Sequence, residues 1–167
     1  MASEPQLVQL CKQAHADSSV RALGCSGCVK YMAGAVGVDL PDDDANALID
    51  YMAANWTVVT KDQAQAYADQ GRFVVAGKKD TPHGHIVVVL PGGPVESGGY
   101  VSDRGRSRGQ TLPSKGKYPR ACSMSSSTHP WPGAISQGEY STFDPWYSDH
   151  GVKYWLAPLA PAAAAGQ

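Results

Sequence analysis

Two residues of this sequence could together form a nucleophile and the base that activates it. The first is Cys25. It lies in the run Gly24-Cys25-Ser26-Gly27, directly before a stretch with apolar residues at helical spacing. Unpaired backbone N–H groups and the positive end of the dipole at a helix start favour a thiolate there. The small neighbours Ser26 and Gly27 leave room for a substrate backbone, and the same N–H groups can stabilise an oxyanion.

His85 is the second residue. It follows Gly84 and opens the apolar run His-Ile-Val-Val-Val-Leu, which is typical of a buried strand. An imidazole at the mouth of a strand can face a helix start that packs across from it, and a thiol beside an imidazole is an activated nucleophile. Cys25 followed 60 residues later by His85 suits papain-like hydrolases, although either residue alone is more often structural.

The surrounding pattern predicts the elements that must hold these two groups. Residues 17–24 and 91–117 are expected to be mainly loop. Helices are predicted over 6–16, 25–37, 44–54 and 61–70, and strands over 72–77, 85–90, 99–102, 119–125 and 152–157. Helices come first and antiparallel strands follow, which predicts an α+β fold. We expect one domain over 1–157 and a low-complexity tail over 158–167.

Composition narrows the classes of protein. The 167 residues carry a net charge of −1, so no global field attracts nucleic acid. No apolar run reaches the roughly 20 residues of a membrane span, and the N-terminus lacks the pattern of a secretory signal. The cysteines at 11, 25, 28 and 122 are too few and too scattered to predict a disulfide framework. We expect a monomer with no cofactor.

Two other interpretations of the cysteines remain open at this point. Cys25-x-x-Cys28 matches the spacing of a redox motif, but the preceding segment does not have the pattern of a strand, as a thioredoxin-like site would require. Cys25, Cys28, His83 and His85 also offer the number and type of ligands that zinc needs. Such a site requires the helix start and the strand start to converge, and would indicate a zinc-stabilised interaction domain.

A basic stretch runs through the long Gly-, Pro- and Ser-rich segment. Between residues 103 and 120 six cations accompany one acid, which indicates either a solvated loop or a surface that attracts carboxylates. The cations are Arg104, Arg106, Arg108, Lys115, Lys117 and Arg120. The aromatic residues Trp131 and Trp146, which follow it, are expected to pack in the core or at the rim of a groove.

Taken together, these motifs resemble the first family of type VI secretion amidase effectors, within the NlpC-type papain-like peptidases. The resemblance spans roughly residues 6–157. Its strongest parts are Cys25-Ser26-Gly27 before an apolar helix and Gly84-His85-Ile86 at a strand start. Weaker parts, in the same order as in the family, are 45–57, 70–77, Tyr118-Pro119 and Ser136-Gln137-Gly138.

The resemblance implies a papain-like fold and a γ-D-glutamyl–meso-diaminopimelate endopeptidase with Cys25 as nucleophile and His85 as base. The third, orienting group is expected at Ser123, with Cys122 or a backbone carbonyl as alternatives. Ser26, Gly27, His83 and Gly84 are expected to contact substrate; His83 can equally be a turn residue.

Partners and location also follow from the resemblance alone. The expected partners are peptidoglycan stem peptides, a cognate immunity protein and the secretion machinery. The protein would be made in the cytoplasm without a cleaved signal and would act in the periplasm of target bacteria as an antibacterial toxin. Some relatives have a disulfide that joins the two ends of the domain, and the absence of cysteine beyond 122 excludes that bridge. A non-catalytic peptidoglycan-binding module is the main alternative.

Overall fold

A computed structural model describes residues 4–127 and 129–159. Four α-helices lie within these residues: α1 (Gln6–Ala16), α2 (Ser18–Ala35), α3 (Ala45–Asn55) and α4 (Lys61–Asp69). The strands of the main sheet are β1 (Thr57–Val59), β2 (Val74–Lys78), β3 (His85–Val89), β6 (Arg120–Ser123), β7 (Ser136–Ser141) and β8 (Lys153–Leu156). The fold is therefore α+β, as the sequence predicts.

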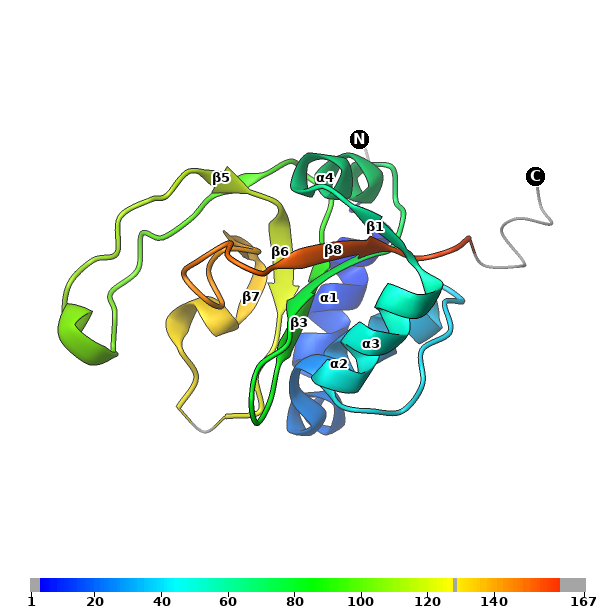
Figure 1. Cartoon of the computed structure of the whole chain (residues 1–167), viewed down its shortest axis with the longest axis horizontal. Helices are drawn as coiled ribbons and strands as arrows, with labels where there is room; N and C mark the ends of the chain where they lie inside the picture. The colour runs from blue at the N-terminus through cyan, green and yellow to red at the C-terminus, as the bar shows by residue number, and fades with distance from the viewer. Residues whose placement is uncertain (1–3, 128, 160–167) are drawn as a thin grey trace.

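The six strands pair antiparallel in the order β1-β8-β2-β3-β6-β7 (Figure 1). The long apolar run of β3 lies in the middle of this sheet, between β2 and β6. Val88 pairs with Cys122 and Val89 pairs with Ala121, so the end of β3 pairs with the middle of β6 and the two strands run in opposite directions. This register brings Ser123, the last residue of β6, close to the first residue of β3.

Alternation along β3 divides the core between two faces. Ile86 and Val88 pack with residues of α1, α2 and α3, whereas Val87 and Val89 pack with Ala64 and Ala68 of α4. These four residues of β3 are fully buried, as expected of a central strand with helices on both faces. The start of β3 is thereby held rigidly from both sides.

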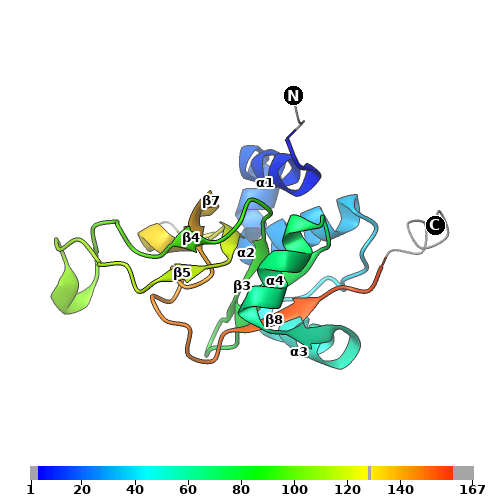
Figure 2. The ribbon, with the colours of Figure 1, turned by 90° about the horizontal axis from the view of Figure 1, so that it is seen from above.

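A two-stranded ribbon extends from this body (Figure 2). It consists of β4 (Val95–Glu96), β5 (Lys117–Tyr118) and the connection between them, which contains the short 3₁₀ helix η1 (Gly105–Ser107). We refer to residues 95–118 as the arm. A second 3₁₀ helix, η2 (Pro132–Ala134), lies between β6 and β7.

Several predicted boundaries were wrong. Residues 18–23, expected as loop, are helical, because the Asp17 carboxylate accepts hydrogen bonds from the Ser19 and Val20 N–H groups. The strand expected at 99–102 is reduced to an isolated bridge at Val101. The short strands β1 and β4 and the six-residue strand β7 were not predicted. Most of the predicted tail lies outside the described residues. Among those described, no helix is long and apolar enough to cross a bilayer.

Candidate active site

Cys25 begins a new helical segment, because α2 is broken immediately before it. Gly24 has φ 71° and ψ −147°, outside the helical region, and divides α2 into two helices. A Cβ at position 24 would lie 3.0 Å from Ser126 Oγ, so both the backbone angle and the space require glycine. The backbone N–H groups around Cys25 are consequently at a helix start, as the sequence predicts.

The Cys25 thiol lies beside the start of β3. Backbone N–H groups of Ile86, Ser26 and Cys25 itself interact with the sulfur and favour its thiolate form. Burial of the thiol is the larger effect and raises the pKa of Cys25 above its ordinary value. The N–H groups at the helix start therefore favour the thiolate, as the sequence predicts, but desolvation outweighs them.

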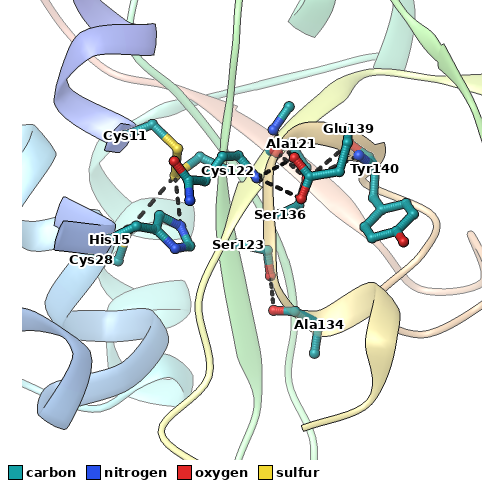
Figure 3. Close-up of a disulfide and its surroundings, with 12 residues drawn as sticks. Cys11, His15, Cys28, Ala121, Cys122, Ser123, Ala134, Ser136, Glu139 and Tyr140 are labelled. Carbon is teal, nitrogen blue, oxygen red and sulfur yellow. Dashed lines mark hydrogen bonds between the residues drawn. A yellow bond between two sulfur atoms is a disulfide. The ribbon is translucent and has the colours of Figure 1, made fainter. Parts of the chain in front are cut away.

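His85 contacts Ser123 on the neighbouring strand. The distance from His85 Nε2 to Ser123 Oγ is 2.8 Å. Ser123 Oγ in turn donates to the carbonyl oxygen of Ala134 at 2.6 Å, a bond that Figure 3 shows. A hydroxyl has one proton, and a carbonyl can only accept. Ser123 must therefore accept from His85, which fixes the imidazole as the Nε2–H tautomer with its lone pair on Nδ1.

The imidazole is neutral around pH 7. Burial lowers the pKa of His85 to about 4. The edge of the Trp146 ring packs against the imidazole, with 5.7 Å between the ring centroids. Nδ1 has no hydrogen-bond partner among the described residues, and Cys25 makes no direct hydrogen bond to the ring there. In unliganded sites such bonds are often long and shorten when substrate binds.

The predicted substrate-contacting residues lie near these groups but have other local contacts. Gly84 is closely approached by Asn46, whose Oδ1 would lie 2.3 Å from an added Cβ. His83 is exposed in the connection between β2 and β3. Ser26 and Gly27 are half-buried, and Ser26 Oγ lies 3.5 Å from the carbonyl oxygen of Leu23.

Asn46 was not singled out from the sequence. Its Nδ2 donates to the Asp80 carbonyl oxygen at 2.7 Å, and its Oδ1 accepts from the Asp80 N–H at 3.2 Å. These two bonds attach α3 to the turn that precedes His85 and hold the strand start in place. Trp146 as a neighbour of His85 and the Ala134 carbonyl as the acceptor of Ser123 were also missed, because neither has a local sequence signal.

The cysteines form a disulfide after all. Cys11 of α1 is bonded to Cys122 of β6, 111 residues away in sequence, which corrects the expectation of no disulfide framework (Figure 3). A pairing between segments so distant in sequence is visible only once the fold brings them together. Cys122 is thereby excluded as a free third group. Cys28 Sγ lies 3.8 Å from Cys122 Sγ, and burial raises the pKa of Cys28 to about 12.

The proposed zinc ligands do not converge. Within residues 4–127 and 129–159, Cys11, His15 and Cys122 form the one group of three or more ligand side chains close enough to share a metal, and two of its sulfurs are bonded to each other. Cys25, Cys28, His83 and His85 do not form such a group. Cys28 instead faces the core next to the disulfide.

The arrangement contains the parts that cysteine-dependent acyl transfer needs: a thiol at a helix start, a neutral imidazole on the adjacent strand, and an acceptor that fixes the imidazole tautomer.

The comparisons with known proteins are consistent with this chemistry. No protein-family profile matches the chain. It is 39% identical over 69 residues to the peptidoglycan amidase Tse1 of Pseudomonas aeruginosa. That match covers 41% of this chain and 45% of Tse1, so the chain spans less than half the length of this relative.

Proposed function

We propose that this protein is a cysteine amidase of bacterial peptidoglycan that hydrolyses the γ-D-glutamyl–meso-diaminopimelate bond of stem peptides. The observation that carries the proposal is the hydrogen-bond relay from His85 through Ser123 to Ala134. This relay leaves a lone pair on Nδ1, at the strand start where the Cys25 thiol lies. The similarity to a peptidoglycan amidase supports the same class of substrate.

The reaction begins from a neutral pair, because the pKa of Cys25 is raised and that of His85 is lowered. His85 Nδ1 takes the thiol proton as the sulfur attacks the amide carbonyl carbon. The imidazolium is stabilised through Nε2–H by Ser123, and the backbone N–H groups beside Cys25 stabilise negative charge on sulfur. The tetrahedral intermediate then collapses as the imidazolium protonates the leaving amine.

Water completes the cycle. His85, neutral again, takes a proton from a water molecule, which attacks the thioester carbonyl carbon. Collapse of this second intermediate releases the carboxylate product, and the proton returns to the sulfur of Cys25. Ser123 acts as a positioning residue throughout, since it contacts the imidazole and not the reacting carbonyl.

The biological setting of the proposal follows the resemblance to the type VI amidase effectors. The protein acts as an antibacterial toxin in the periplasm of target cells, delivered by secretion machinery and blocked in the producer by an immunity protein. An immunity protein that covers Cys25 and His85 would bind this chain tightly and abolish its hydrolysis of muropeptides.

The test is hydrolysis of purified muropeptides, followed by the appearance of new amino groups and by product mass. The wild-type protein should release the peptide beyond the γ-D-glutamyl bond, and Cys25→Ala should abolish release. Cys28→Ala is the matched control, because it removes a thiol one helical turn away and should retain activity. Turnover that survives Cys25→Ala would refute the proposal. Binding of muropeptides without turnover would instead indicate a non-catalytic module.

A further inference from the structure

An open pocket of about 500 Å³ lies next to the candidate active site. One wall comes from the arm, around η1, and the other from the chain on either side of β7. The lining residues are Arg104, Gly105, Arg106, Ser107, Leu112, Trp131, Pro145, Trp146 and Tyr147. The hydroxyl of Tyr147 donates to the carbonyl oxygen of Pro113 at 2.5 Å, which links the two walls.

The pocket is positively charged although the protein as a whole is not. Arg104 and Arg106 line it, and none of the lining residues is acidic. Acids also lie beside it. Asp144, which directly precedes the lining residue Pro145, is fully buried, and its carboxylate accepts hydrogen bonds from Gly98, Tyr100 and Ser141 rather than facing the pocket arginines. Asp103 lies 3.9 Å from Arg104 Nε, and both side chains are more than half exposed. Such an exposed pair contributes little and does not neutralise the site. The charge is therefore local, since the net charge of the chain is −1.

Arg104 is held by an aromatic ring. Its guanidinium carbon lies 5.0 Å from the centroid of the Trp131 ring, a cation–π contact. The contact restricts the guanidinium to one side of the ring, and the side chain stays 62% exposed, so its N–H donors are accessible to a ligand. An arginine oriented in this way is suited to a carboxylate, which it can bind through two parallel hydrogen bonds.

The two tryptophan side chains of the pocket, Trp131 and Trp146, are both connected to the candidate catalytic groups. Trp146 contacts the pocket and also packs edge-on against His85. Trp131 directly precedes η2, whose last residue, Ala134, accepts the Ser123 hydrogen bond. A ligand in this pocket is thus one ring away from the imidazole, near enough to belong to the peptide that is cut.

We propose that this pocket binds a free carboxylate of the substrate peptide through Arg104 and Arg106, so that the protein selects anionic stem peptides. The inference rests on the proposed function for the identity of the peptide. It gives a role to two of the six cations in the basic stretch, which the catalytic chemistry does not use, and to two aromatic side chains at the edge of the site.

The experiment measures binding to the full chain carrying Cys25→Ala, which prevents turnover. The probe is a soluble muropeptide, with its diaminopimelate carboxylate either free or amidated, titrated by calorimetry. Amidation should weaken binding about tenfold or more, the range for a hydrogen bond between charged groups. Adding Arg104→Gln and Arg106→Gln should weaken binding of the free form similarly and abolish the difference between the two forms.

The matched control is Arg108→Gln with Lys115→Gln. It removes the same charge from exposed positions of the arm outside the pocket and should leave the amidation effect intact. If the Arg104 and Arg106 substitutions leave the amidation effect unchanged, the inference is overturned, whether or not wild-type protein hydrolyses muropeptides. If the effect depends on these arginines but wild-type protein cleaves nothing, the pocket stands as an anionic-peptide site and the proposed amidase activity fails.

Discussion

Ser123 Oγ lies 2.8 Å from His85 Nε2 and is 1% exposed, so a single buried hydroxyl stands between the imidazole and the backbone of η2. Replacing it with alanine leaves the partly buried Nε2–H without its acceptor. We expect Ser123→Ala to lower kcat about ten- to a hundredfold, in line with about 1–3 kcal/mol for an unsatisfied buried donor.

The tautomer of His85 shows whether Ser123 positions the imidazole or only stabilises the fold. Nitrogen NMR of the His85 ring should show the proton on Nε2 in the wild type and a mixture of tautomers in Ser123→Ala. Ser127→Ala, at an exposed serine of the following loop, should change neither kcat nor the spectrum. An unchanged tautomer together with unchanged kcat in Ser123→Ala would remove Ser123 from the mechanism.

The low pKa of His85 sets the acid limit of activity. The base must be neutral, and burial lowers the pKa of His85 from its usual value near 6.5 to about 4. We expect kcat/KM to stay nearly constant between pH 7 and 5 and to fall only as the pH approaches 4. A profile that already falls by half near pH 6.5 would contradict a desolvated imidazole.

The same shift predicts how stability depends on pH. Between pH 6.5 and 4 the unfolded chain binds a proton at His85 that the folded chain does not, so the stabilisation is complete above pH 6.5 and is lost as pH falls toward 4. Urea unfolding at pH 7 and pH 4.5 should show a loss of roughly 1–3 kcal/mol from this group. His85→Ala should reduce the pH dependence by that amount; an identical pH dependence in both proteins would argue against the shift.

How much of this site could be predicted from the sequence depends on the range of the interactions. Cys25 and His85 are marked by local patterns: a glycine directly before a predicted helix and an apolar run that starts a strand. Ser123 was placed only through the resemblance, and its contact with His85 depends on the register between β3 and β6. The polar edge strand β7 lacks the apolar alternation by which strands are recognised. The helical turn at 18–23 has a readable signal, since Asp17 is a strong N-cap residue.

Replacement of Gly24 in α2 by a larger residue is predicted to destabilise the fold. An alanine there would require φ near 71° and would press against Ser126, so Gly24→Ala should lower the free energy of unfolding by about 1–3 kcal/mol and disturb Cys25. Gly34 of the same helix has open space around its Cα. Gly34→Ala should instead stabilise by about 0.5–1 kcal/mol. Equal effects of the two substitutions in urea unfolding would contradict the break at Gly24.

The Cys11–Cys122 disulfide should contribute substantially to stability. It closes a loop with a sequence separation of 111, for which chain-entropy arguments and measured cases suggest about 2–5 kcal/mol. Cys11→Ala combined with Cys122→Ala should lower the free energy of unfolding by that amount and make it insensitive to thiol reductants. The wild type should lose the same amount on reduction, and no change on reduction would show that the bond does not stabilise the fold.

The most direct test of the central claim is capture of the acyl-enzyme on Cys25. Protein mixed with muropeptide and quenched in acid during turnover should gain the mass of the acyl part of the substrate, and digestion should locate that mass on Cys25. The adduct should be absent from Cys25→Ala and present in Cys28→Ala. Turnover without any adduct on Cys25, or an adduct on another residue, would contradict Cys25 as the nucleophile.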